Sequence, residues 1–501
     1  MRHTLRRSCS ACAKSKHSCD LGTPRCSRCI KRKVQCFYAN EPLTGPPRGP
    51  SSTTAPPPSQ NTIIPLGTRF ASVDPFESYP QTRLPREHVQ RLIHSFLHKI
   101  AFQYYPLDLS ATSNPFLVSW WPLALGDPAL FHVSLQTACL DEELLAQKGF
   151  QASTVLMADS VALLRQKVGD STLAVQDGTM NSVITLAAIE FGKGNTRVSE
   201  MHVAGVKRLV SLRGGISAVR QTSPLTARMV SWVSLLIMGH PQFGTQDDAG
   251  IGDGIPPIPE WQLDTSNPGH EPSNLNIEFP VKNVFIRLGR VFQRAQSGIP
   301  FPNTRLHDLT CFAVHRLLLS APNPAADSQS SPMTECIRYG VVLYMFIIQG
   351  PTYFSHAVII DTLVTSFRLH LERLESTHQE VNAWLAAVGL VASTGTPHYQ
   401  WFVERAHAVS ASSRLRSWAE VLACIRSFLW LERPHSEDIF RPHWDIIFAP
   451  SNDLNATTTT TIDISQPITP RSLTIRVPPR GSPPRKNSGV LTSSTDIIGF
   501  G

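Results

Sequence analysis

Apolar residues recur with helical spacing along most of the chain beyond residue 85. The clearest stripe follows Pro85 and consists of Val89, Leu92, Ile93, Phe96, Leu97 and Ile100. These positions fall at i, i+3, i+4, i+7, i+8 and i+11, which places them on one face of a helix. Alternation with a period of two residues is scarce. The pattern therefore predicts an all-α domain of packed helical hairpins over residues 85–449.

Local signals mark where individual helices begin and end. Asp127 followed by Pro128 is a helix cap with proline at the first helical position, which predicts a helix through Leu140 or beyond. Gly214-Gly215 indicates a helix end, and a Gly- and Pro-rich stretch at about 240–281 predicts loops. Further helices are predicted at about 152–168, 173–191, 200–213, 225–238, 283–297, 305–320, 333–349, 358–375, 378–391 and 414–431.

Two segments have the composition of irregular chain. Residues 41–84 are rich in Pro, Ser and Thr, and we expect an extended, polyproline-like linker there. A coiled coil cannot pass through it, because a proline inside a helix costs about 3 kcal/mol. Residues 450–501 contain a threonine run followed by Pro, Ser and Arg, which predicts a disordered tail.

The positive charge of the chain is concentrated at its N-terminus. The first forty residues hold ten Lys and Arg and one acid, a net charge of +9, whereas the whole chain of 501 residues carries +8. A dense basic block ahead of a near-neutral body is typical of a nucleic-acid contact or a nuclear import signal. The N-terminus has no apolar stretch like that of a secretory signal, and no apolar run approaches the length of a membrane span. We therefore expect neither a secreted nor a membrane protein.

Six of the ten cysteines lie within the basic block and form two equal halves. Each half is a C-x2-C pair followed by a third cysteine seven residues on, and the six are Cys9, Cys12, Cys19, Cys26, Cys29 and Cys36. A C-x2-C pair can direct two sulfurs at one metal ion. Two tetrahedral zinc ions need eight ligand positions, so six thiolates suffice only if two of them bridge both ions. The symmetry of the two halves makes Cys9 and Cys26 the natural bridging pair.

A scaffold of three disulfides is the alternative use of these cysteines. It requires an oxidising compartment, for which the sequence offers no secretion signal. The neighbouring basic residues also lower thiol pKa values and favour metal binding. Apart from Leu21, Ile30 and Val34 the cluster has almost no aliphatic side chains. Zinc binding, about 10–16 kcal/mol per structural site, would then supply its folding energy.

Residues 9–36 resemble the fungal zinc binuclear cluster family of transcription factors, with all six cysteines at the family's spacing. The resemblance implies two short helices around two zinc ions bridged by Cys9 and Cys26. Cys12 and Cys19 would complete one site, and Cys29 and Cys36 the other. Residues 1–40 would form this DNA-binding module.

The resemblance also implies which residues contact DNA. Lys16 stands at the family's base-reading lysine, with Lys14 close by, whereas Ala13, Ser15 and Ser18 depart from the usual basic run. A lysine at a helix end can donate to guanine N7 and O6 in the major groove, and family members read short CGG-like triplets. The remaining residues expected at the interface, mainly as phosphate contacts, are His17, Arg25, Arg28, Lys31, Arg32 and Lys33.

The helical region resembles the fungal-specific transcription factor domain that accompanies zinc clusters. The matching stretches are 74–80, 201–215 and 428–430. This resemblance implies a regulatory domain that responds to a ligand or partner. No enzyme motif is present: Gly250 to Gly254 is followed by prolines where a nucleotide-binding helix should begin. Cys139, Cys311, Cys336 and Cys424 are scattered on apolar stretches, as buried core thiols are.

Taken together, the sequence predicts a nuclear, zinc-dependent, sequence-specific regulator of RNA polymerase II transcription that is not an enzyme and controls a metabolic or biosynthetic pathway. Expected partners are double-stranded DNA and the transcription machinery or co-regulators. A small-molecule effector and a homodimer formed through the helical domain are further candidates. The alternative is a protein-interaction scaffold whose zinc module is structural and lacks specific DNA binding.

Overall fold

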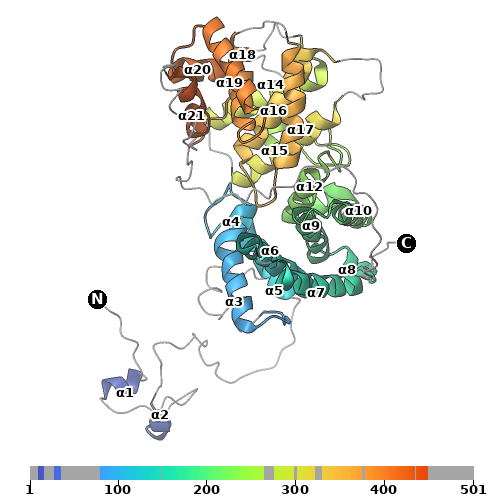
Figure 1. Ribbon diagram of the computed structural model, residues 1–501. Helices are drawn as coiled ribbons and strands as arrows, with labels where there is room; N and C mark the ends of the chain where they lie inside the picture. The colour runs from blue at the N-terminus through green and yellow to red at the C-terminus, as the bar shows by residue number, and fades with distance from the viewer. Residues whose placement is uncertain are drawn as a thin grey trace. The chain divides into compact units, whose positions relative to one another are not determined.

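Figure 1 shows a computed structural model of the chain, which divides into two compact units, Met1–Ser78 and Tyr79–Gly501. The structure describes residues 10–15, 27–34, 79–147, 149–263, 276–297, 302–321, 330–374, 379–434 and 436–449. Most of the predicted linker and all of the predicted tail lie outside these residues. The boundaries predicted for the four segments of the chain stay predictions.

The described part of the first unit consists of two short helices, α1 (Ser10–Lys14) and α2 (Ser27–Lys31). The second unit is helical throughout its described residues, apart from loops and one isolated parallel bridge between Thr245 and Ile255. Its first helices are α3 (Arg86–Ser95), the π-helical η2 (Phe96–Ile100), α4 (Ala101–Tyr104), the π-helical η3 (Phe116–Trp120), α5 (Trp121–Gly126), α6 (Pro128–Ala146), α7 (Gln151–Val168), α8 (Ser171–Ala174), α9 (Asp177–Gly192), α10 (Thr196–Leu212), α11 (Gly215–Thr222) and α12 (Pro224–Met238). Those that follow are α13 (Pro259–Gln262), α14 (Phe279–Ser297), α15 (Asn303–Leu319), α16 (Pro332–Gln349), α17 (Ala357–Glu372), α18 (Gln379–Ala392), α19 (Tyr399–Ser412), α20 (Trp418–Phe428) and α21 (Ser436–Phe448).

The earlier helices of the second unit are organised around α6 and α9. Asp127 caps α6 by accepting hydrogen bonds from the backbone N–H groups of Ala129 and Leu130, as the sequence predicts. Both helices are buried on nearly every face, which identifies them as the centre of this half. Helices α3, α5, α7 and α9 pack against α6, and α10 and α12 pack against α9.

The later helices surround α16 and α18. Helix α16 is buried on most faces and contacts α14, α15, α17 and α18 (Figure 1). Helix α18 in turn contacts α19, α20 and α21. Because consecutive helices such as α6 and α7, α9 and α10, or α16 and α17 pack against each other, the predicted large helical domain is confirmed.

Some predicted helices differ in detail from those observed. The helix predicted at 173–191 is two helices, because the Asp170 side chain caps the short α8 and a turn then leads into α9. No helix was predicted at η3, α5, α11, α19 and α21, and α13 lies in the stretch at about 240–281 that was predicted to form loops. Helix α11 begins at once after Gly214, whose φ of 95° ends the preceding helix. Helix α21 contains Pro442, which argues against a helix in a sequence pattern.

Two tryptophans and two cysteines are buried packing residues. Trp120 and Trp121 are fully buried, Cys311 and Cys336 lie in the core, and burial raises the pKa of each of these two thiols to about 12. Among the described residues, no helix has the length and apolar character needed to cross a membrane. Residues 250–254 form a loop, as predicted.

Candidate metal centre and nucleic-acid interface

Helices α1 and α2 are each a little over one turn long and contact each other. The Ser15 hydroxyl donates to the Ala11 carbonyl oxygen over 2.8 Å at the end of α1. At the end of α2, Lys33 adopts a left-handed conformation with φ of 51°, and the Val34 N–H donates to the Cys29 carbonyl oxygen. This is the hydrogen-bond pattern of a Schellman cap, which stops the helix after a single turn.

The two helices bury one cysteine each at equivalent positions of the repeat. Cys12 and Cys29 are the second cysteines of their halves, and each is only 2% exposed. Both line one surface hollow of about 340 Å³ between α1 and α2. Thiols that are shielded from water and brought toward one hollow from two short helices fit the thiolate ligands of structural zinc. Cys9, Cys19, Cys26 and Cys36 lie outside the described residues, so the full ligand set stays a prediction.

The aliphatic side chains that the structure describes in this unit are exposed. Ile30 is 58% exposed and Val34 is 42% exposed, although they are two of the few aliphatic residues of the cluster. A segment that leaves its aliphatic side chains in water gains little free energy from hydrophobic burial. The described residues of the unit therefore offer little stability from apolar burial, and bound zinc holding the thiolates together would add stability of another kind.

Five of the predicted DNA-contacting residues are described, and all five are exposed: Lys14, Arg28, Lys31, Arg32 and Lys33. Lys14, Arg28 and Arg32 border the hollow that contains the two cysteines. Residues 10–15 and 27–34 contain no acidic side chain to offset them. The described part of the unit is therefore a positively charged surface suited to phosphates. Lys16, His17 and Arg25 lie outside the described residues.

Comparison with protein families finds a match in part of each unit. Residues 7–44 match the family model of the fungal Zn(2)-Cys(6) binuclear cluster domain, and residues 91–239 match the fungal specific transcription factor domain. The chain carries these two domains in that order. By these descriptions, residues 7–44 are similar to a zinc cluster domain and residues 91–239 to a transcription factor domain. The match at 91–239 includes the stretch at 201–215 but not those at 74–80 and 428–430.

Among curated proteins, the chain is similar to the transcription factor pgmR of Aspergillus terreus (strain NIH 2624 / FGSC A1156). The two are 43% identical over 56 residues, which cover 11% of this chain and 30% of that protein. No solved structure matches the chain.

Proposed function

We propose that the protein is a nuclear regulator of RNA polymerase II transcription that reads CGG-like triplets through a two-zinc module. The observation that carries this proposal is the arrangement of α1 and α2. They bury Cys12 and Cys29 in one hollow and surround it with exposed basic side chains. The six cysteines hold two zinc ions in this proposal, with Cys9 and Cys26 bridging.

Each group of basic residues has its own role in binding. Lys16, two residues beyond the end of α1, donates to guanine in the major groove and discriminates between bases by about 1–3 kcal/mol. Arg28, Lys31, Arg32 and Lys33 are exposed on and after α2 and neutralise phosphates. Phosphate contacts position the module on the duplex without reading sequence, and they make binding weaken as salt rises.

The test is a selection from a randomised DNA duplex pool with the full, zinc-loaded chain at near-physiological salt, together with a determination of zinc per chain. We expect two zinc ions per chain and enrichment of CGG-like triplets. The number and spacing of the triplets report whether one or two chains bind. Two zinc ions without an enriched sequence would contradict specific reading and favour the scaffold function.

A further inference from the structure

One short segment of the later half makes hydrogen bonds to the first half of the helical unit. Residues 350–356, which we call the strap, connect α16 to α17. The strap begins at Gly350, whose φ of 77° turns the chain away from α16. Tyr353 then fixes it to the first half: its N–H donates to the Gln103 carbonyl oxygen over 2.7 Å, and its hydroxyl donates to that of Thr137 over 3.2 Å.

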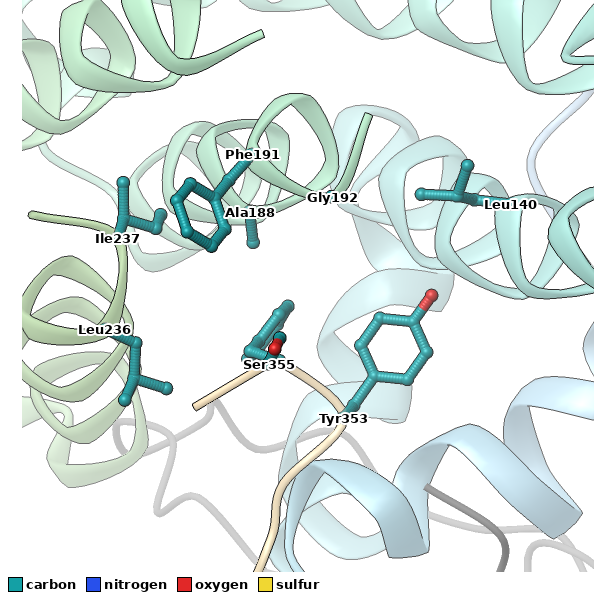
Figure 2. Close-up of a pocket in the computed structure, with 9 residues that line it drawn as sticks. Leu140, Ala188, Phe191, Gly192, Leu236, Ile237, Tyr353 and Ser355 are labelled. Atoms are coloured by element: carbon teal, nitrogen blue, oxygen red, sulfur yellow. The ribbon is translucent and has the colours of Figure 1, made fainter. Parts of the chain in front are cut away.

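The strap closes two clefts that share one residue, Phe354. The first cleft, shown in Figure 2, is almost entirely apolar. In the figure, Leu140, Phe191, Leu236 and Ile237 come from α6, α9 and α12 and surround the strap residues Tyr353 and Ser355. Including its open side, this cleft holds about 470 Å³ of space.

The second cleft is also lined by Phe354 and has polar groups in its wall. Apolar side chains, including Phe116, Met229 and Val233, line it together with Tyr105, Arg228, Trp232 and His307. It holds about 350 Å³ including its mouth, and its enclosed part of about 20 Å³ has room for about one water-sized group. Because the half-buried Phe354 lines both clefts, we expect a longer ligand to fit when its ring rotates and the clefts connect.

Two hydrogen-bond donors in this wall have no partner in the described part of the chain. The Tyr105 hydroxyl and the Trp232 indole N–H are both sealed from solvent, and the two residues are each 3% exposed. Their rings lie on the same histidine, with centroid distances to His307 of 5.8 and 5.5 Å. Burial of an unsatisfied donor is unfavourable, because the donor loses its hydrogen bond to water. A ligand that brings an acceptor to both donors recovers that free energy.

The charges beside these donors favour an anion. Arg228 and Arg220 both form ion pairs with the carboxylate of Asp308, which leaves one net positive charge on the three side chains. Arg228 donates its Nε and Nη2 to Asp308, and its Nη1 has no partner among the described residues. Two further charged side chains, Asp108 and Arg433, interact electrostatically with Tyr105. One is negative and the other positive, so together they leave the net charge near the donors unchanged.

We propose that the second cleft binds a small apolar carboxylate. Its oxygens accept hydrogen bonds from Tyr105, Trp232 and Arg228, and its hydrocarbon part lies past Phe354 in the cleft of Figure 2. The ligand would contact residues of both halves of the helical unit, including the strap residue Phe354, so its binding would stabilise one arrangement of the halves. This site lies wholly in the helical unit and does not depend on DNA binding.

The test is isothermal titration calorimetry of the full chain, without DNA, against straight-chain carboxylates from acetate to octanoate and primary alcohols of the same lengths. We expect the carboxylates to bind at least tenfold more tightly than the alcohols. Tyr105→Phe and Trp232→Phe each keep an aromatic ring and remove one donor, so each lowers carboxylate affinity about tenfold. Phe354→Ala removes the group between the clefts and strengthens octanoate binding.

Trp121→Phe is the matched control. Trp121 also has a buried indole N–H without a partner in the described part of the chain, but it packs against Phe96 and Phe131 and lines neither cleft. Its replacement leaves carboxylate affinity unchanged, and thermal melts confirm that every variant folds. Equal affinity for carboxylates and alcohols, unchanged affinity in Tyr105→Phe, or no binding by either the parent chain or Phe354→Ala would overturn the proposal.

Discussion

The described residues of the two units differ in what they bury. The helical unit buries a large set of apolar side chains, including Trp120, Trp384 and Trp444, all at most 1% exposed. In the described part of the N-terminal unit, the buried hydrophobic side chains are Cys12 and Cys29, while Ile30 and Val34 remain exposed. A fold with a core of its own tolerates loss of a ligand, whereas a fold without one depends on it. Removal of zinc should therefore unfold the N-terminal unit and leave the helical unit folded.

Loss of a bridging thiolate should have the largest effect. Cys26→Ser removes a ligand expected to serve both zinc ions, and metal binding contributes about 10–16 kcal/mol per structural site. We expect the variant to lose both zinc ions and specific DNA binding while the helical unit keeps its melting temperature. Zinc per chain and far-UV circular dichroism measure the two effects.

Cys424→Ser is the control for this experiment. Cys424 lies half-buried on α20 in the helical unit, so its replacement leaves the zinc content unchanged. Retention of two zinc ions by Cys26→Ser would refute the bridging assignment.

Acid should destabilise the helical unit through buried histidines. Burial lowers the pKa of His307, His315 and His356 to about 4, below the value of about 6.5 in an unfolded chain. Between these pH values the unfolded state binds protons that the folded state does not. The free energy of unfolding is therefore fully retained above about pH 6.5 and falls by about 1.4 kcal/mol per pH unit for each histidine as the pH drops toward 4.

His315→Leu tests this pH dependence one proton at a time. The free energy of unfolding is measured by urea melts of the zinc-free chain between pH 6.5 and 5. Its slope against pH should be shallower in the variant than in the parent chain, by the amount that corresponds to one proton. His240→Gln, at an exposed loop position, should leave the slope as it is. The account fails if His315→Leu and the parent chain have equal slopes.

Overpacking of the core should affect the helical unit alone. A Cβ atom at Gly389 of α18 would lie 2.1 Å from Cε1 of Phe402, a fully buried ring. Gly389→Ala is therefore expected to lower the free energy of unfolding by about 1–3 kcal/mol without changing the zinc content. Gly289→Ala, in α14 with no atom within 4 Å of the added carbon, should instead stabilise by about 0.5–1 kcal/mol. Equal effects in the two variants would contradict this packing.

A change at the DNA surface should have an effect confined to binding. Lys16→Ala should cost about 1–3 kcal/mol of discrimination between the selected duplex and an unrelated one. Lys31→Ala should instead weaken binding to both duplexes and reduce the salt dependence by about one phosphate contact. Equal losses on both duplexes for Lys16→Ala would exclude a base-reading role. Fluorescence anisotropy across a salt series measures all of these quantities.

How well the sequence predicted the structure depended on how local each signal was. The start of α6 was predictable because Asp127 and Pro128 act within one turn. Helix α11 was missed because Gly214-Gly215 suggested only an end, and α21 because Pro442 lies inside it. The cysteine spacing pointed to a metal centre before any geometry was known, and the burial of Cys12 and Cys29 fits it.

The cleft beneath the strap left no signal in the sequence. Tyr105, Trp232 and His307 lie on distant parts of the chain and come together only through the packing of α12, α15 and the strap. A site assembled by long-range packing has no fixed spacing to recognise. The feature that suggests a ligand is a pair of buried donors beside an excess of positive charge. This feature appears only in the folded structure.

The most direct test of the account compares DNA affinity before and after zinc removal. The full chain is titrated with its selected duplex and with a scrambled duplex at near-physiological salt, then again after chelation and after zinc is restored. The account predicts that preference for the selected duplex disappears on chelation and returns with zinc, while the helical signal stays constant. Preference that persists without zinc would contradict it.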